Sequence, residues 1–359
     1  MRHRAVLSLH RHRPREGFTI IELLVALVII SLLVALLLPA IGRTRETARR
    51  HQCLSHMHNL GIGLTAFDGT FRRLPASGNW GHDAHWNSYP LHTWAVAILP
   101  QIEQAAIYNQ WHRDESLESP TNEALSREQI PLYQCPSDIS LTGKGDISYA
   151  VCGGVGYTNR HSNGTRDVPV NMDNDPLDLN GDGVYPHLPG TDSIPTDREL
   201  FKRMGLFFME TWNTPITKRT HALADIMDGQ SQTLMLTENY RAGSDPRSPR
   251  ASFADPDPLR CAVYYKDPCD NSQNCRPGHV HYGVTNQGVN RINQGLLQPE
   301  GKSPVANSFH PGGVNALLAD GSGRFLNERI DGPVLAALFS PQGQLLAGLP
   351  LEQVTSHEF

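Results

Sequence analysis

The chain has 359 residues, of which 39% are hydrophobic and 19% are charged, and its formal net charge is −5. This balance is typical of a globular protein and argues against an intrinsically disordered chain. The negative net charge gives no reason to expect nucleic acid as a partner. The 31 glycines and 26 prolines indicate a loop-rich body that contains β-strands.

Residues 1–17 form a basic N-terminal segment with five arginines and one glutamate. The positive-inside rule predicts that such a segment stays in the cytoplasm and that the body beyond the next apolar stretch is exported. We interpret residues 1–17 as a cytoplasmic leader, which does not contribute to the fold. The body is then expected in the periplasm or at the cell surface.

The apolar stretch at residues 18–41 is 24 residues long, and Glu22 carries its one ionisable side chain. A helix of this length spans roughly 36 Å, enough to cross a hydrocarbon core of about 30 Å. An ionisable group inside such a segment is a functional hypothesis by default. Pro39 lacks an amide hydrogen and is expected to kink or locally unwind the helix. The alternative is an ordinary signal anchor that tolerates a glutamate near its edge.

Residues 42–68 are predicted to continue this helix as an amphipathic segment. Apolar residues recur there at spacings of three and four, which places them on one helical face. That face consists of Cys53, Met57, Leu60, Leu64 and Phe67. It is expected to pack against the body, and Asp68-Gly69 is expected to end the helix. The alternative is two separate helices joined at Pro39.

Residues 69–359 are predicted to form an extracytoplasmic globular domain. Its expected elements are a loop at 74–89, strands at 200–210 and 232–238, a C-terminal hairpin at 308–328 and a helix at 333–339. Residues 160–196 are acidic and lack periodicity, so we interpret them as an inserted loop. Together these patterns favour an α+β fold with a long N-terminal transmembrane helix packed on an antiparallel sheet.

Six cysteines are present in the sequence. Disulfides are permitted if the body lies outside the cytoplasm, and six cysteines allow fifteen connectivities. The group most expected to contain a bridge is the local one, Cys261, Cys269 and Cys275. A metal site is the competing interpretation, but no CxxC pair supports it.

A half-motif for calcium lies in the acidic insertion. Asp178, Asn180 and Asp182 follow the spacing D-x-N-x-D-G, which can surround one cation with oxygen ligands. The twelfth position is Pro189 instead of the usual glutamate, so the motif is incomplete. The alternative is a solvated turn rich in Asp and Asn. A calcium ion here would be structural, and no other cofactor is indicated.

Two histidine arrangements could carry chemistry. His310 with Asp320 could form a general base and its orienting carboxylate, but the structural interpretation, a hairpin turn capped by Asp320, is favoured. His279 and His281 alternate along an extended segment and could bind zinc, or they could be exposed polar residues of a strand.

The segment GFTIIE at residues 17–22 resembles the processing signature of type IV pilins and type II secretion pseudopilins. The resemblance implies cleavage between Gly17 and Phe18 by a prepilin peptidase, with N-methylation of Phe18. It makes Glu22 the fifth mature residue and gives Pro39 the position where many pilins have a proline. Glu22 would then be the counter-ion of the Phe18 ammonium, most plausibly between neighbouring subunits.

Five segments of the body together resemble a family of bacterial prepilin-like proteins with domain of unknown function 1559. These segments are residues 49–53 with 59–61, 94–104, 135–138, 225–238 and 309–325. The last contains a histidine, nine residues and then Asp-Gly: His310, Asp320 and Gly321. This element also marks the C-terminal part of the family. The resemblance carries no activity with it, because the biochemical role of the family is not established.

The function predicted from these patterns is structural and not enzymatic. The protein is expected to be a prepilin-like subunit that is anchored in, or assembled from, the cytoplasmic membrane by self-association or with other pilin-like subunits. The alternative is a membrane-anchored binding module that uses the pilin signal only for export and anchoring. A third class is an anchored hydrolase with a histidine-based metal site. The motifs of the common enzyme classes are absent from the sequence, which lowers this expectation.

Overall fold

The computed structural model describes residues 19–82, 88–160, 167–170, 179, 196–211, 221–240, 252–265, 291–294 and 305–346. The chain divides into two compact units, Met1–Ala48 and Arg49–Phe359. The first unit holds the apolar helical segment, and the second is the globular body.

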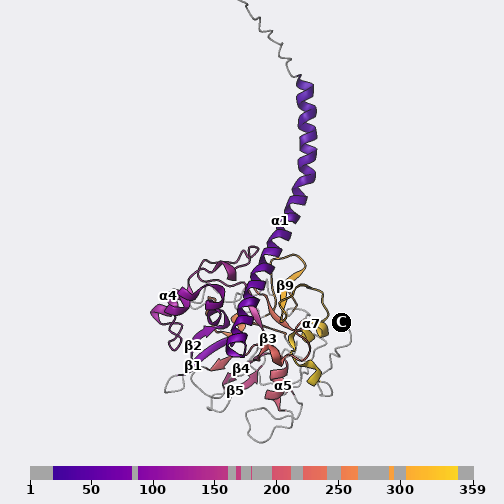
Figure 1. Ribbon diagram of the computed structural model, residues 1–359. Helices are drawn as coiled ribbons and strands as arrows, with labels where there is room; N and C mark the ends of the chain where they lie inside the picture. Colours follow the sequence, from indigo (N-terminus) through magenta and orange to yellow (C-terminus); the bar gives the residue numbers. More distant parts are fainter. Residues whose placement is uncertain are drawn as a thin grey trace, which may run out of the picture. The chain divides into compact units, whose positions relative to one another are not determined.

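Helix α1 (Ile20–Phe71) is a single helix of 52 residues (Figure 1). Its helical backbone continues through Pro39, so local unwinding and the alternative of two separate helices are both wrong, while a kink at Pro39 stays a prediction. The helix runs a few residues past the expected stop. It ends where Arg72 adopts a φ of 56° and donates its amide hydrogen to the Asp68 carbonyl at 2.7 Å. A left-handed residue at this point is a common way to terminate a helix.

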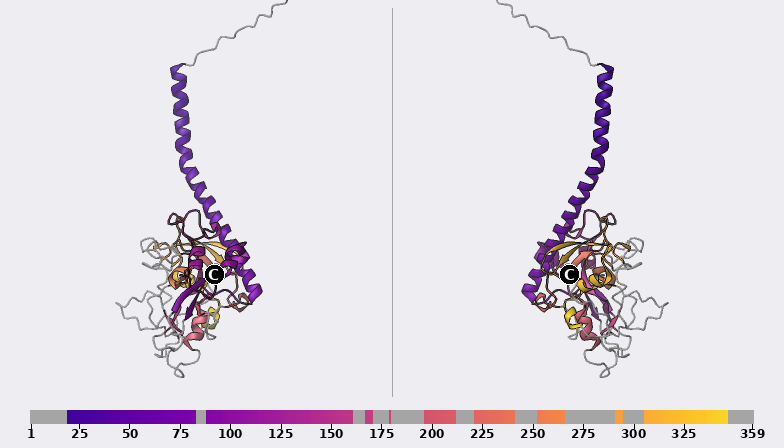
Figure 2. Two further views of the ribbon diagram at one scale, coloured as in Figure 1. Left: turned by 90° about the vertical axis from the view of Figure 1, so that its left-hand side faces the viewer. Right: turned by 90° about the vertical axis from the view of Figure 1, so that its right-hand side faces the viewer.

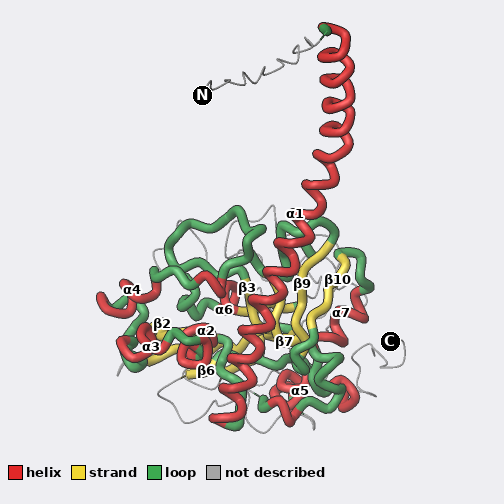
Figure 3. Tube along the Cα trace, turned by 45° about the horizontal axis from the view of Figure 1, so that its top comes forward, coloured by secondary structure: helices red, strands yellow, loops and turns green. Residues whose placement is uncertain are grey.

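The part of α1 within the body packs on it through the predicted apolar face. All five side chains of that face, from Cys53 to Phe67, are buried. Gly61 allows a close approach, because a Cβ atom there would lie 2.4 Å from Leu317 Cδ2. Figure 3 shows this part of α1 crossing the strands of the main sheet, and Figure 2 shows it along one margin of the body. Gly61 lowers the intrinsic stability of the helix, but it allows α1 to pack closely on Leu317 of the sheet.

The main sheet of the described body has five strands in the order β10-β9-β7-β3-β8. Its strands are β3 (Tyr149–Gly154), β7 (Leu234–Glu238), β8 (Ala262–Tyr264), β9 (Gly313–Leu318) and β10 (Gly323–Asn327). Neighbours are antiparallel except for β3 and β8, which are parallel. The strands β3, β7, β8 and β9 are buried along their whole length, because α1 covers part of the sheet and the rest of the core lies around it.

A second sheet lies beside the first and corrects the prediction of a loop at 74–89. It has the order β2-β1-β6, from β1 (Gly78–His82), β2 (Ser88–Thr93) and β6 (Glu210–Thr211). Strand β1 pairs antiparallel with β2 and parallel with β6. A third, two-stranded sheet joins β4 (Tyr157–Arg160) to β5 (Asp167–Val170), so the predicted insertion at 160–196 contains a strand.

The predicted strand at 200–210 is also wrong. Helix α5 (Asp197–Arg203) occupies its first part, and it begins with a capping box between Thr196 and Glu199. Reciprocal side-chain and backbone hydrogen bonds at a helix start favour helix over strand. Only the short strand β6 remains at the end of the segment.

The other helices of the described body are short. The α-helices are α2 (Trp94–Ala97), α3 (Ala105–Gln110), α4 (Pro120–Ser126), α6 (Pro258–Cys261) and α7 (Gly332–Phe339). The 3-10 helices are η1 (Leu99–Ile102), η2 (Pro131–Tyr133), η3 (Leu223–Asp225) and η7 (Gly343–Leu346). The expected helix at 333–339, strand at 232–238 and C-terminal hairpin are all present. The predicted fold class, a pilin-like α+β fold, is confirmed, with sheets that are mixed instead of purely antiparallel.

Candidate functional site

Four segments that are far apart in the sequence meet at one buried group of side chains, which we call the sulfur–carboxylate cluster. It consists of Cys53, Cys135, Glu238 and His310. Cys53 lies on α1, Cys135 follows η2, Glu238 ends β7, and His310 lies in the turn before β9. None of the four is more than 5% exposed. Each comes from a different one of the five segments that resemble the 1559 family.

The cluster contains a disulfide between Cys53 and Cys135, with Cα atoms 5.0 Å apart. Cys135 Sγ lies 3.5 Å from His310 Nε2 and 3.8 Å from Glu238 Oε1. His310 Nε2 and Glu238 Oε1 are 3.1 Å apart and form a buried pair. The disulfide ties α1 covalently to the body.

Asn315 on β9 holds the Glu238 carboxylate in place. Its backbone amide donates to Glu238 Oε2 at 2.7 Å, and its side-chain amide donates to Oε1 at 2.9 Å. A buried carboxylate is tolerated only where donors compensate for the water it has lost. The β7–β9 pairing therefore supplies the site with a fixed acceptor.

The loop that carries Cys135 is organised by Asp138. Its Oδ1 accepts hydrogen bonds from the Ser140 amide and hydroxyl, and its Oδ2 accepts one from the Ser148 hydroxyl at 2.6 Å. The Ser148 oxygen in turn accepts from the Cys135 amide at 3.0 Å. Burial raises the pKa of the Asp138 carboxyl, and the serine hydrogen bonds oppose that rise. The segment Cys-Pro-Ser-Asp is thus a folded unit that presents the sulfur.

His310 and Asp320 do not form the pair that their spacing could have suggested. Asp320 accepts from the Ser322 amide at 2.8 Å and from its hydroxyl at 2.6 Å, within the turn of the β9–β10 hairpin. Those hydrogen bonds lower the pKa of the Asp320 carboxyl. Gly321 has a φ of 82°, which a glycine adopts without strain. The favoured structural interpretation of Asp320 holds, and the carboxylate beside His310 is Glu238.

The membrane-proximal site residues are described only in part. Gly17 and Phe18 lie outside the described residues. Glu22 Oε2 accepts hydrogen bonds from the amide and the hydroxyl of Thr19, at 2.9 and 2.7 Å, in the unprocessed chain. Glu22 therefore caps the start of α1, while its assembly role stays a prediction.

Most of the other predicted metal and disulfide residues lie outside the described part of the chain. This applies to Asp178, Asn180, Asp182, Cys269, Cys275, His279 and His281. Cys261 is described and is a buried free thiol, so a bridge within this group would have to join Cys269 to Cys275. Burial raises the pKa of this thiol, which makes it inert.

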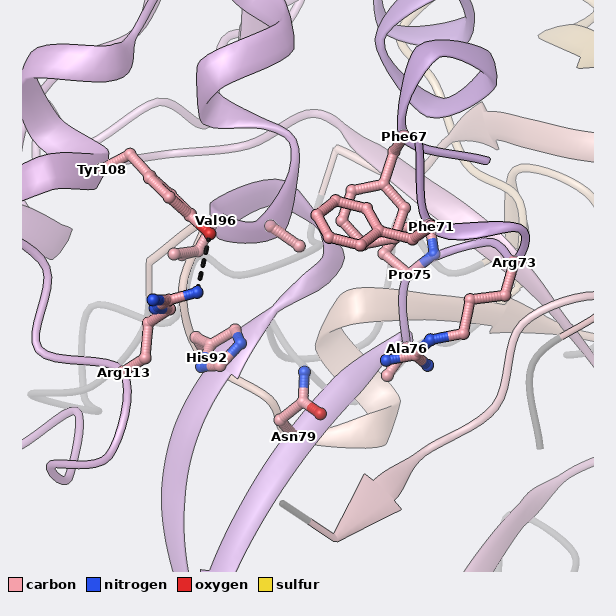
Figure 4. Close-up of a pocket in the computed structure, with 11 residues that line it drawn as sticks. Phe67, Phe71, Arg73, Pro75, Ala76, Asn79, His92, Val96, Tyr108 and Arg113 are labelled. Carbon is pink, nitrogen blue, oxygen red and sulfur yellow. Dashed lines mark hydrogen bonds between the residues drawn. The ribbon is translucent and has the colours of Figure 1, made fainter. Parts of the chain in front are cut away.

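A cavity of about 100 Å³ lies elsewhere in the body, beside the end of α1 (Figure 4). Its polar lining includes Arg73, Asn79, His92 and Arg113. Arg73 pairs with Glu210 at 2.9 Å, and Arg113 donates to the Tyr108 hydroxyl at 3.1 Å, a hydrogen bond drawn as a dashed line in Figure 4. Pockets for small molecules usually measure about 300 Å³ or more, so this cavity is too small to identify a binding site.

His92 makes stability depend on pH. Burial, together with the nearby positive charge of Arg113, lowers the pKa of His92 to about 4. The unfolded imidazole binds a proton below a pH of about 6.5, whereas the folded one stays neutral. The free energy of unfolding should therefore fall by about 3 kcal/mol as the pH drops from about 6.5 to about 4.

Urea titrations of the wild type and of His92→Gln across this pH range check the expectation. The variant has no imidazole to protonate, so the difference in unfolding free energy between the two proteins should change with pH. A difference that stays constant from pH 7 to pH 4 would contradict the assignment.

Comparison with known protein families bears out both resemblances. Residues 12–38 match the family described as the prokaryotic N-terminal methylation motif. Residues 42–332 match the family described as "Protein of unknown function (DUF1559)". No curated protein and no solved structure matches the chain.

The methylation motif and the long apolar helix α1 define the class of the protein, which is that of type IV pilin-like precursors. Because the second match covers most of the sequence, the chain belongs to the DUF1559 family.

The sulfur–carboxylate cluster combines residues from four of the segments that resemble this family. The sequence alone does not predict this cluster, because helical spacing places Cys53 on an apolar face and the strand pattern places Glu238 at a strand end. The sequence contains one indication of the cluster, which is that each of these four segments includes a cysteine or an acidic residue.

Proposed function

We propose that this protein is a prepilin-like structural subunit. In this proposal a prepilin peptidase cleaves the chain after Gly17, and residues 18–41 hold it in the cytoplasmic membrane or in an assembly drawn from that membrane. The body lies on the far side, since the arginine-rich leader stays in the cytoplasm. The observation that carries the proposal is the methylation motif at residues 12–38, which covers the start and most of the apolar half of α1.

The surface of that half supports membrane insertion and helix packing. Between residues 20 and 41, sixteen large apolar side chains are each at least 46% exposed. Leaving such a surface in water is unfavourable, and a bilayer or the helices of neighbouring subunits would cover it. Within the described residues, α1 is the one helix long and apolar enough to span a membrane.

The alternative of an anchored binding module has less support. The cavity beside Arg113 is small, and two of its cationic groups already have partners within the body. The DUF1559 body, in contrast, is cross-linked to α1, which suits a subunit that transmits force or position from helix to body.

Mass spectrometry of the N-terminus of the protein isolated from its native membrane tests the proposal. A chain that begins with N-methylated Phe18 is the expected result. An intact leader on the mature protein would contradict it and would leave an ordinary signal anchor.

Glu22→Ala separates processing from assembly. The variant should still be cleaved, but its recovery in cross-linked complexes of subunits should fall at least about tenfold, because the Phe18 ammonium loses its counter-ion. Ser31→Ala is a matched control on the same helix, since the Ser31 hydroxyl bonds only to the Val28 carbonyl at 2.8 Å. Equal assembly of Glu22→Ala and wild type would refute the role of Glu22.

A further inference from the structure

The sulfur–carboxylate cluster has the donor set of a structural zinc site. Cysteine sulfur, histidine nitrogen and carboxylate oxygen are the ligands that Zn²⁺ prefers, in tetrahedral groups of four. Cys53, Cys135, His310 and Glu238 each offer one such atom, and these atoms all lie within 4.8 Å of one another.

The spacing of three of these atoms is close to that of a tetrahedron, although one pair is slightly too near. With bonds of ~2.0 to ~2.3 Å to zinc, neighbouring ligand atoms lie about 3.2 to 3.8 Å apart. Cys135 Sγ lies 3.5 Å from His310 Nε2 and 3.8 Å from Glu238 Oε1, and these last two atoms are 3.1 Å apart. The remaining sulfur, that of Cys53, is held in the disulfide bond, which reduction would open.

The presence of a disulfide does not explain why the polar side chains of Glu238 and His310 are buried beside it. It is uncharged and packs like an apolar group, whereas burying a carboxylate and an imidazole costs free energy. Glu238 and His310 are nevertheless 1% and 2% exposed and face the sulfur of Cys135. Asn315 also fixes the carboxylate through two hydrogen bonds, as the supporting residues of metal ligands do.

We propose that reduction of the Cys53–Cys135 disulfide converts this cluster into a zinc site. A dithiol reductant supplies two electrons and two protons, so the S–S bond is replaced by two thiols and the reductant becomes a disulfide. One Zn²⁺ then displaces the two thiol protons and binds Cys53 Sγ, Cys135 Sγ, His310 Nε2 and Glu238 Oε1. In either state the cluster ties α1 to the body, by a covalent bond when oxidised and through the metal when reduced.

The binding test uses the full-length protein in detergent and zinc chloride alone. One sample is kept oxidised, and another is reduced with a dithiol that is removed without air before equilibrium dialysis. Reduction should add about one tightly bound zinc ion per chain. Cobalt(II) in place of zinc should give thiolate-to-metal charge-transfer absorption in the reduced sample only. Equal zinc content in the two samples, or no such absorption, would overturn the proposal.

Variants assign the site to the cluster. Cys53→Ser and Cys135→Ser should abolish the added zinc, and His310→Ala should weaken its binding by at least about tenfold. Cys152→Ser, Cys261→Ser and a Cys269→Ser/Cys275→Ser double variant are controls that should keep it. Disulfide mapping of oxidised His310→Ala establishes that its cluster still assembles. Unchanged zinc uptake by Cys53→Ser and Cys135→Ser, or its loss in the control variants alone, would place the metal elsewhere.

Discussion

Removing the Cys53–Cys135 disulfide should lower the free energy of unfolding of the body by about 4 kcal/mol. The bond joins residues separated by 82 positions in the sequence. Closing a loop of that size restricts the unfolded chain, and in the chain-entropy model this restriction stabilises the folded state by about 4 kcal/mol. The bond also fastens α1 to the segment Cys-Pro-Ser-Asp, so its loss should loosen the contact between the helix and the body.

Urea titration in detergent, followed by the intrinsic tryptophan fluorescence to which the buried Trp94 contributes, measures this change. The double variant Cys53→Ala/Cys135→Ala and the reduced wild type with a metal chelator should lose similar amounts of stability. Cys152→Ala is the control, because Cys152 is buried but forms no disulfide, so this variant loses side-chain packing and a weak thiol contact with the Phe339 carbonyl at 3.7 Å. A loss no larger than that of Cys152→Ala would indicate that the two cysteines are not joined.

The parts of the fold that could be predicted are those with strong local periodicity. The apolar face from Cys53 to Phe67 follows helical spacing over four turns, and every member is buried. The hairpin around Asp320 and Gly321 combines two apolar strands with a turn sequence that fixes its own geometry. In both places, neighbouring residues along the chain contain all the information that the local structure requires.

The predictions that are wrong concern segments whose state depends on distant contacts or on helix caps. Residues 200–210 are apolar enough for a strand, but the Thr196–Glu199 capping box starts a helix. Residues 78–82 contain two glycines, a composition that predicts a loop, yet they form strand β1. Gly81 instead leaves room for the Tyr89 ring across the hairpin, since a Cβ atom would lie 2.3 Å from it. Neither effect is visible in hydrophobic periodicity.

The candidate site could be predicted only in its parts. His310 was singled out by its motif, but its partner Glu238 lies 72 positions earlier, at the end of an antiparallel strand. The pairing of Cys53 with Cys135 likewise depends on where α1 crosses the sheet. Proximity in sequence favours a bridge within the group Cys261, Cys269 and Cys275, but within the described residues Cys261 is free and the bridge joins Cys53 to Cys135. Such pairings depend on which distant segments the fold brings together, and residues that are neighbours in the sequence do not reveal this.

Glu238→Ala should destabilise the body by about 3 to 5 kcal/mol, a loss comparable to that of the disulfide. The carboxylate accepts two hydrogen bonds from Asn315 and faces His310 at 3.1 Å, all in the interior. Alanine would leave these groups buried without their acceptor. Breaking one side of a buried pair costs this much because the remaining polar partner cannot reach water.

The same urea titration tests this expectation, with two comparison variants. Glu238→Gln keeps the shape and one acceptor oxygen, so it should lose less stability than Glu238→Ala. Glu328→Ala removes a carboxylate that pairs with Arg291 at the same 3.1 Å, but both side chains there are 32% exposed. That loss should not exceed about 1 kcal/mol, because solvent screens the pair and replaces its hydrogen bonds. Equal losses of unfolding free energy for Glu238→Ala and Glu328→Ala would mean that the buried Glu238 pair stabilises the body no more than the exposed Glu328 pair does. We expect a much larger loss for Glu238→Ala than for Glu328→Ala. That result would show that the stability comes from the buried hydrogen bonds of Glu238 with His310 and Asn315, and not from an ion pair as such.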